Sequence, residues 1–196
     1  MDNNYIFQYW AAIENGTVTV GKWIRTIYKI LVDGLKSGKW DYDEGKAEKA
    51  IKFIENFCHH SEGRNDLLKL ELWQKAIVSA IFGIMDKKTG YRQFREVFIV
   101  VARKNGKTLF AAAIAAYMTY IDGEYGAKVY FLAPKLDQAE LVYDAFYQIV
   151  QADDELDSIT KKRRSDIYIK EFNTSVKNDC FQLKKIRRFQ PSNGCE

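Results

Sequence analysis

The sequence is poor in residues that break or cross-link a chain. It has only two prolines, Pro134 and Pro191, and neither a low-complexity linker nor an internal repeat. Its three cysteines include no CxxC pair, so neither a zinc site nor a disulfide framework is supported. The run Cys58-His59-His60 is not a good ligand set, because adjacent residues on a helix point in different directions. We interpret that run as an ordinary helix end.

Signals for a membrane or for export are also missing. No run approaches the ~20 apolar residues that a membrane helix needs. The stretch Leu109–Ile121 is too short and is interrupted by Tyr and Thr. The first residues, Met1–Asn4, show no basic region followed by an apolar core, so no secretory signal is visible. We therefore expect no membrane partner and a protein that stays in the cytoplasm.

The composition is that of a folded domain with an uneven charge distribution. Of 196 residues, 47% are hydrophobic and 14% aromatic, which is ample for a core. The net charge is +4, but residues 161–196 hold ten Lys and Arg against four Asp and Glu. Such a basic tail on a near-neutral body either contacts nucleic acid or is simply solvated.

The first ninety residues predict helices. Apolar residues recur at roughly helical spacing in Gly16–Gly38, Asp41–His60 and Asp66–Gly83. We therefore expect residues 1–90 to form a helical N-terminal region.

The pattern changes after residue 90. Val97–Val101 is a continuous β-branched and aromatic run, typical of a strand buried on both faces of a parallel sheet. A loop, Ala102–Lys107, leads to Thr108–Tyr120, which is apolar on nearly every side and predicts a buried helix. Lys128–Ala133 then predicts a strand and Leu136–Gln151 a helix. This order indicates an α/β domain in which the two strands are parallel neighbours or near-neighbours.

The signal weakens beyond residue 152. Ile167–Ile169 predicts a short strand, whereas Asn173–Glu196 shows no clear element. We therefore expect residues 91–196 to form an incomplete α/β core with a basic C-terminal tail.

The most informative segment is Val101–Thr108, which reads V-A-R-K-N-G-K-T. It matches the phosphate-loop pattern G-x-x-x-x-G-K-[ST] except that Val101 replaces the first Gly. Gly106 lets the backbone turn so that its amides face phosphate oxygens, and Lys107 can reach the β- and γ-phosphates. Thr108 opens the helix, and its hydroxyl can bind Mg²⁺. The alternative is a basic surface turn, but the flanking strand and helix favour an ATP-phosphate-binding loop.

A second candidate lies about thirty residues upstream. The Gln74 side-chain amide offers one donor group and one acceptor, which match the N6/N7 edge of adenine. Gln74 is therefore either an adenine-reading residue or an ordinary surface residue of a helix.

These segments together resemble the large terminase subunit of tailed bacteriophages, from about Tyr42 to Ser175. The resemblance rests on Leu72-Trp73-Gln74, Ile81-Phe82-Gly83, Arg95-Glu96-Val97, the Val101–Thr108 loop, Asp122-Gly123-Glu124, Val129–Pro134 and Gln138-Ala139. This family commonly lacks the first glycine of the phosphate loop and carries basic residues inside it, so Val101 agrees with the resemblance.

The resemblance implies roles for single residues. Lys107 and Thr108 would hold the ATP phosphates and Mg²⁺, with Lys104, Asn105 and Gly106 in the same loop. Arg103 would match the loop arginine that responds to the γ-phosphate, and Gln74 the adenine-reading glutamine. The implied fold is a P-loop NTPase-type parallel sheet flanked by helices.

The resemblance also implies a function and partners. A complete subunit of this family uses ATP to move double-stranded DNA into a capsid, and its nuclease domain cuts the DNA. The implied partners are double-stranded DNA, the small terminase subunit, the portal protein and further copies of the chain. The implied location is the cytoplasm of a bacterial host, and the gene would belong to a phage or prophage.

Two family features are missing from the sequence. No apolar strand ends in Asp-Glu, the pair that supplies the Mg²⁺ carboxylate and activates water, and no nuclease domain is encoded. We therefore expect a truncated subunit with little turnover. Robust turnover would mean that an acid such as Asp166, Glu171 or Asp179 supplies the carboxylate. The alternatives are an inactive prophage remnant that at most binds nucleotide, and a helicase-like ATPase.

Overall fold

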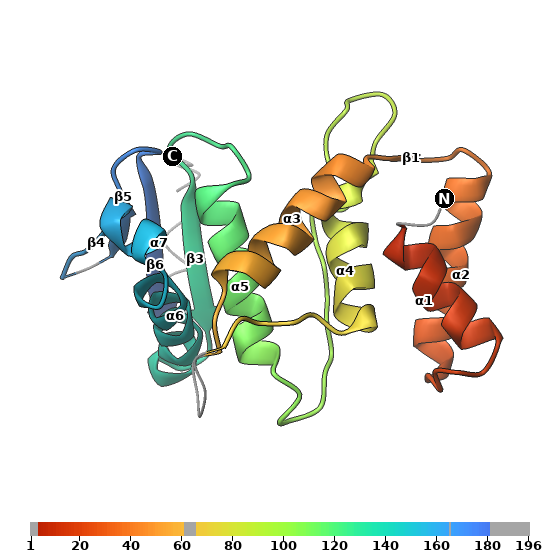
Figure 1. Ribbon diagram of the computed structural model, residues 1–196, viewed down its shortest axis with the longest axis horizontal. Coiled ribbons are helices and arrows are strands. Elements are labelled where there is room, and N and C mark those ends of the chain that lie inside the picture. Colours follow the sequence, from red (N-terminus) through yellow and green to blue (C-terminus); the bar gives the residue numbers. More distant parts are fainter. Residues whose placement is uncertain (1–3, 61–65, 165, 181–196) are drawn as a thin grey trace, which may run out of the picture. The chain divides into compact units, whose positions relative to one another are not determined.

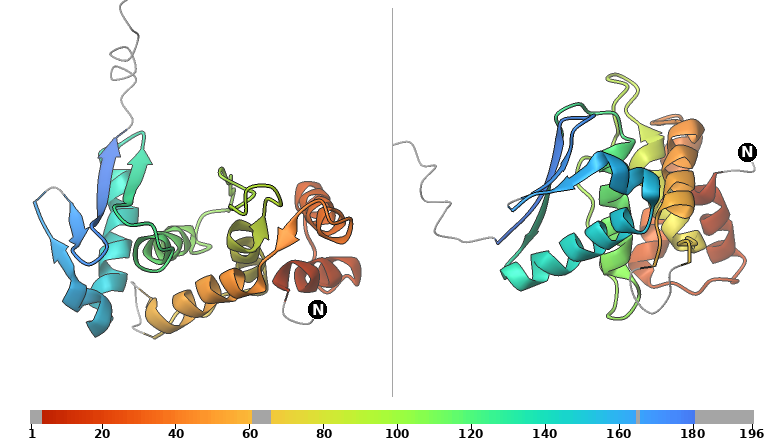
Figure 2. Two further views of the ribbon diagram at one scale, coloured as in Figure 1. Left: turned by 90° about the horizontal axis from the view of Figure 1, so that it is seen from above. Right: turned by 60° about the vertical axis from the view of Figure 1, so that its left-hand side comes forward.

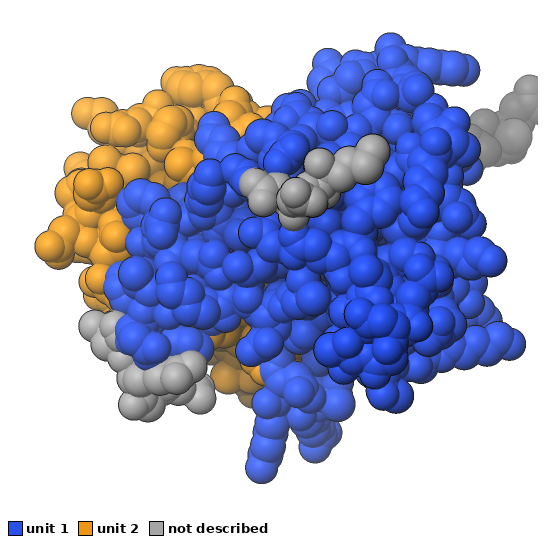
Figure 3. Space-filling model, turned by 45° about the vertical axis from the view of Figure 1, so that its right-hand side comes forward, with its two compact units in different colours: residues 1–105 blue, residues 106–196 orange. Residues whose placement is uncertain are grey.

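The computed structural model describes residues 4–60, 66–164 and 166–180 (Figure 1). It is an α/β protein, as the sequence predicts. The chain divides into two compact units, residues 1–105 and 106–196, which Figure 3 shows in different colours. Among the described residues, no helix has both the length and the apolar character needed to span a bilayer.

Unit 1, residues 1–105, is mainly helical, which confirms the prediction for the N-terminal part of the chain. A two-stranded antiparallel sheet joins β1 to β2. The elements of unit 1 are α1 (Tyr5–Glu14), α2 (Lys22–Lys36), β1 (Asp41–Tyr42), α3 (Glu44–Phe57), α4 (Leu72–Gly83) and β2 (Ile84–Met85). The helix α1 was not singled out from the sequence. It starts at Asn4, whose Oδ1 accepts from the backbone N–H of Ile6 at 3.0 Å, and this bond satisfies a donor at the helix start.

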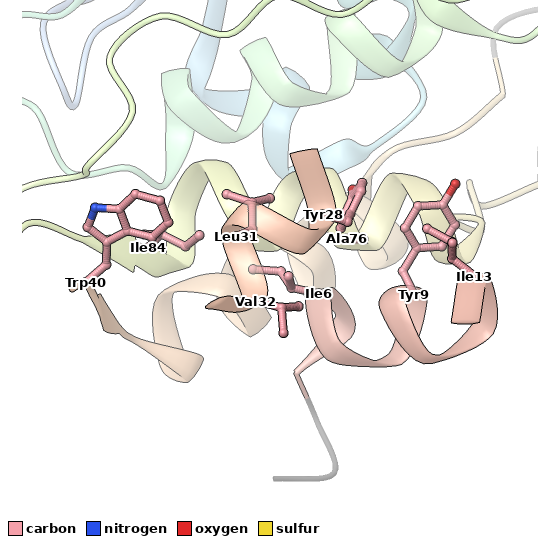
Figure 4. Close-up of a cluster of buried hydrophobic side chains, with 9 residues drawn as sticks. All are labelled: Ile6, Tyr9, Ile13, Tyr28, Leu31, Val32, Trp40, Ala76 and Ile84. Carbon is pink, nitrogen blue, oxygen red and sulfur yellow. The ribbon is translucent and has the colours of Figure 1, made fainter. Parts of the chain in front are cut away.

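A cluster of buried side chains holds α1, α2 and α4 together (Figure 4). Tyr9 and Tyr28 meet edge to face with ring centroids 4.7 Å apart, so α1 and α2 are joined by an aromatic contact. Burial raises the pKa of Tyr28, so its hydroxyl stays neutral throughout the ordinary pH range. The cluster consists of Ile6, Tyr9, Ile13, Tyr28, Leu31, Val32, Trp40, Ala76 and Ile84.

Unit 2, residues 106–196, contains a mixed sheet with strand order β3-β6-β5-β4. β3 and β6 are parallel, with Lys128 opposite Ser175, whereas β4, β5 and β6 pair antiparallel. The sheet is therefore mixed, and only one of its three pairings is parallel. The elements of unit 2 are α5 (Lys107–Tyr120), β3 (Lys128–Ala133), α6 (Leu136–Gln151), α7 (Asp154–Ile159), β4 (Thr160–Lys162), β5 (Ile167–Ile169) and β6 (Thr174–Cys180).

Helix α6 covers one face of this sheet (Figure 2). Phe131 of β3 contacts Tyr143 and Phe146 of α6, with ring centroids 6.4 and 6.0 Å apart. On the opposite face of β3, Tyr130 and Leu132 are 50% and 60% exposed. Burial therefore alternates along β3, as it does in a strand that is covered on one side.

For three elements of unit 2, the structure confirms the first and last residues that the sequence predicts. The predicted strands Lys128–Ala133 and Ile167–Ile169 and the predicted helix Leu136–Gln151 have the bounds of β3, β5 and α6. The absence of an element after Asn173 was a wrong prediction, because Thr174–Cys180 forms β6. The strand has few apolar residues, and its pairing with both β3 and β5 specifies it instead. The remainder of that segment, residues 181–196, lies outside the described residues.

The predicted buried strand Val97–Val101 was also wrong. These residues have no regular secondary structure, and Phe98 and Val100 are 93% and 79% exposed. Within the described chain the neighbour of β3 is β6, so the predicted parallel pairing of β3 with Val97–Val101 is wrong as well. An apolar run predicts a strand only if other strands supply its hydrogen-bond partners, and local sequence does not specify those partners.

The packing of Trp40 against α2 gives a test of unit 1. A Cβ added at Gly34 of α2 would overlap the Trp40 ring. Alanine normally stabilises a helix interior by about 1 kcal/mol relative to glycine. At Gly34, overpacking costs about 1–3 kcal/mol, so Gly34→Ala is expected to lower the melting temperature measured by circular dichroism.

The matched control is Gly45→Ala in α3. There the new Cβ would meet only Asp43 Oδ1, at 3.4 Å, so the helix-propensity gain should dominate and the melting temperature should hold or rise. Equal effects of the two substitutions would contradict the packing of Trp40 against Gly34.

Candidate nucleotide-binding site

The loop before α5 turns through two left-handed residues. Lys104 has φ +67° and Gly106 has φ +64°. This conformation costs glycine nothing, but it is uncommon for a lysine and marks a strained position. A Cβ built at Gly106 would have no atom within 4 Å, so the backbone there is open to an approaching group. The sequence argument that Gly106 supplies a turn agrees with this geometry.

Asn105 ties the loop to itself. Its Nδ2 donates to the carbonyl oxygens of Ala102 at 3.4 Å and Arg103 at 3.3 Å. Both hydrogen bonds are long, so they hold the turn only weakly. The loop therefore has a defined turn, but the weak hydrogen bonds of Asn105 allow its backbone to adjust.

Helix α5 begins without a side-chain cap. The N-cap is Gly106, which has no side chain to cap the helix. The first helical hydrogen bond runs from Phe110 N–H to the Gly106 carbonyl at 2.9 Å. The preceding N–H groups of a helix have no intrahelical partner. Together with the positive end of the helix dipole, such groups form a site for an anion.

Three cationic residues lie close to the start of α5 in the sequence. Arg103, Lys104 and Lys107 are all exposed, and Thr108 is half-buried. No ion pair of theirs occurs among the residues that the structure describes. Cations that have no acidic partner repel one another, and a phosphate group would relieve that repulsion.

The rest of α5 is firmly packed within unit 2. Its buried face is rich in alanine, which lets α6 approach closely. Near its C-terminal end, Tyr120 OH and Thr160 Oγ1 form a hydrogen bond of 2.6 Å. Burial raises the pKa of Tyr120, so this hydroxyl stays protonated. The open start of α5 therefore belongs to a helix whose other end is fixed.

The start of α5 lies at a particular end of the sheet. The short segment 121–127 connects the C-terminal end of α5 to the first residue of β3, so the two elements run in opposite directions (Figure 1). The start of α5 is consequently at the carboxyl end of β3, the end at which open α/β sheets bind ligands.

One acidic residue lies at the same end. Asp179 is the next-to-last residue of β6, which is parallel to β3, and it is opposite Leu132. The sequence named Asp179 as one of three possible acids but gave no reason to prefer it. The sequence of β6 is too polar to be recognised as a strand. The position of the Asp179 carboxylate therefore became clear only from the register of β6 against β3.

Gln74 has a structural role in unit 1. It is 8% exposed and occupies the third position of α4. Its Oε1 accepts from the backbone N–H of Glu71 at 2.8 Å, which caps the helix. An amide oxygen has a second lone pair, so this bond leaves acceptor capacity. The role of Gln74 in reading adenine stays a prediction.

The comparisons with known proteins agree with the resemblance seen in the sequence. The family model for the terminase large subunit, ATPase domain, matches residues 72–183. The structure is similar to the crystal structure of the HK97 bacteriophage large terminase, with 25% sequence identity and a TM-score of 0.58. That match covers 67% of this chain and 26% of the HK97 chain, so this chain spans about a quarter of that terminase. The comparison with curated proteins gave no match.

The family implies nucleotide use, usually with a metal ion. The family match includes the Lys104–Thr108 loop, α5, β3 and all of β6, and it extends over more than half of the chain. The chain belongs to the family of terminase large-subunit ATPase domains.

Proposed function

We propose that this chain binds Mg-ATP at the start of α5 and is the ATPase part of a motor that packages double-stranded DNA into phage capsids. The observation that carries the proposal is the loop of Arg103–Gly106, which is open, cationic and partly left-handed, and which leads into an uncapped helix. A triphosphate fits such a site because it supplies the negative charge and acceptor oxygens that the loop lacks.

Each residue of the loop has a role in the proposal. Lys107 binds the β- and γ-phosphates as a point charge, and Arg103 responds to the γ-phosphate. Lys104, Asn105 and Gly106 surround the phosphates with backbone N–H groups and positive charge. The Thr108 hydroxyl is the metal ligand on α5, and a bound Mg²⁺ would neutralise charge on the phosphate oxygens.

Asp179 is the acid best placed to assist Thr108. It lies at the carboxyl ends of β3 and β6, where α5 begins. Glu171 follows β5, which runs antiparallel to β6, so it belongs to the opposite end of the sheet. Asp166 is only 7% exposed, which restricts its access to a bound ligand. We propose Asp179 as the carboxylate on the Mg²⁺ side of the site.

The family supplies the wider context. We propose double-stranded DNA as the substrate that is moved, and the small terminase subunit, the portal protein and further copies of the chain as partners. The proposed location is the cytoplasm of a bacterial host that carries a phage or prophage. We also propose that residues 1–90 form a helical region that includes an adenine-side segment, and residues 91–196 an incomplete P-loop ATPase core with a basic C-terminal tail.

A second candidate is nucleotide binding without turnover. None of the described strands ends in adjacent Asp and Glu, and β6 ends in Asp179-Cys180. Phosphoryl transfer to water needs phosphate clamping, a held metal ion and an oriented nucleophile. The described residues offer candidates for the first two requirements only, which favours this reading for the isolated chain.

Lys107→Ala is expected to weaken the binding of a fluorescent ATP analogue by roughly tenfold or more. A hydrogen bond to a charged group contributes about 1.5–3 kcal/mol. The control is Lys170→Ala, which removes an exposed lysine between β5 and β6, at the opposite end of the sheet, and should leave affinity unchanged. Wild-type affinity in Lys107→Ala would refute the phosphate role.

Gln74 is tested by two substitutions that separate its capping from its proposed adenine contact. Glutamate keeps the acceptor that caps α4 but loses the amide donor. Gln74→Glu should therefore keep the wild-type melting temperature and lose preference for ATP over GTP analogues. Gln74→Ala should lose both, with roughly 1 kcal/mol of stability. An unchanged ATP/GTP affinity ratio in Gln74→Glu would remove the adenine role.

Steady-state phosphate release, with and without DNA, distinguishes the two candidate functions. We expect turnover by the 196-residue chain to be little above background. Losing a group that stabilises the transition state typically costs on the order of 10²–10³-fold. Robust turnover that Lys107→Ala abolishes would contradict the second candidate. If Asp179→Asn also abolished that turnover, Asp179 would be identified as the catalytic carboxylate.

A further inference from the structure

The hairpin of β4 and β5 carries four consecutive cations. Lys161 and Lys162 belong to β4, and Arg163 and Arg164 to the following turn; all four are exposed. The Arg163 N–H donates to the carbonyl of Asp166 at 2.7 Å across the turn. This basic hairpin, residues 160–169, is not part of the proposed nucleotide site.

The cations of the basic hairpin are held differently from lysines in unit 1. Lys52 and Lys75 pair with Glu48 at 2.7 Å and Glu55 at 3.1 Å. In the described part of the chain, no comparable ion pair involves Lys161, Lys162, Arg163 or Arg164. The hairpin therefore has a net positive charge, with four cations against the buried Asp166.

Two of these cations lie over aromatic rings instead. Lys162 Nζ is 4.0 Å from the ring centroid of Tyr147, and Arg163 Cζ is 3.6 Å from that of Tyr168. A cation–π contact orients a cation without neutralising it, and its N–H donors stay available. The side chains are thus positioned while their charge stays open to an anion.

The cations occupy both faces of the hairpin. Lys161 is the register partner of Tyr168, so it shares that face with Arg163, which stacks on the same ring. Lys162 is the next residue of β4 and lies over Tyr147 of α6, on the other face. The hairpin is the edge of the four-stranded sheet, so its exposed cations are offered to a phosphate backbone from that edge.

The turn of the basic hairpin lies at the same end of unit 2 as the start of α5. Ile167 pairs antiparallel with Val176, in the middle of β6, so the strand direction leads from Ile167 back toward the carboxyl end of β6. That end of β6 lies beside the end of β3, where α5 begins. The basic turn and the start of α5 therefore both lie toward the carboxyl ends of β3 and β6.

We propose that the basic hairpin contacts the phosphate backbone of double-stranded DNA without reading its sequence. This inference rests on the proposed function, which supplies DNA as the substrate. The rings of Tyr147 and Tyr168 each have a face occupied by a cation, and bases of a single strand would need such faces for stacking. Phosphate contact along a duplex is therefore favoured over single-strand binding.

The test is fluorescence anisotropy of a labelled duplex oligonucleotide with the 196-residue chain, without nucleotide, over a series of salt concentrations. The variant Lys161→Gln/Arg164→Gln removes two exposed cations that make no ring contact. We expect roughly tenfold weaker binding at about 0.1 M salt and a salt slope smaller by about two.

Two controls accompany this variant. Lys49→Gln/Lys69→Gln removes the same charge from exposed positions of unit 1 and should keep most of the affinity. Lys161→Arg/Arg164→Lys keeps the charge of the hairpin and should keep the salt slope. Melting curves by circular dichroism verify that each variant is folded.

Two results would overturn the proposal. One is a hairpin variant with the salt slope of the wild type; the other is single-stranded DNA of equal length competing better than duplex. The proposed function fails separately, if ATP affinity survives Lys107→Ala, because that assay contains no DNA and the anisotropy assay contains no ATP.

Discussion

The start of α5 is the constraint on which the rest of unit 2 depends. A helix that begins at Gly106 without a side-chain cap leaves backbone donors open, and three nearby cations lack acidic partners in the described chain. Such an arrangement costs stability by itself. The C-terminal part of the helix offsets that cost through its buried alanines and the hydrogen bond between Tyr120 and Thr160. One end of α5 is thus rigid, and the other end is free to bind an anion.

The topology of the sheet gathers chemistry at the end where α5 begins. Parallel pairing of β3 with β6 brings Asp179 to that end, and the antiparallel hairpin returns its basic turn there as well. In our proposals this end of the sheet binds the phosphates and Mg²⁺ of ATP beside Asp179, and the basic hairpin contacts DNA. The opposite end holds Glu171 and the short loops, and none of the proposed chemistry is assigned to it.

The sequence predicted the elements that are marked by continuous apolar runs or by an apolar stripe, namely α5, β3 and α6. The sequence-based prediction failed for segments whose structure depends on pairing between strands. Val97–Val101 is apolar but unpaired in the described chain, whereas the polar segment Thr174–Cys180 becomes a central strand because β3 and β5 flank it. The candidate phosphate loop could be proposed from the sequence because its glycine and lysine are local requirements, and its role stays a prediction. Asp179 could not be preferred over the other acids because its position depends on a non-local register, and the capping bond of Gln74 became visible only with atomic geometry.

Amide hydrogen exchange with and without Mg²⁺ and a slowly hydrolysed ATP analogue tests the central claim most directly. The account predicts that nucleotide slows exchange in peptides that cover residues 102–109, because phosphate oxygens then accept from the open N–H groups at the start of α5. Protection should require Lys107 and should be weak or absent over α7. Unchanged exchange at residues 102–109 under saturating nucleotide, or protection confined to other segments, would contradict the account.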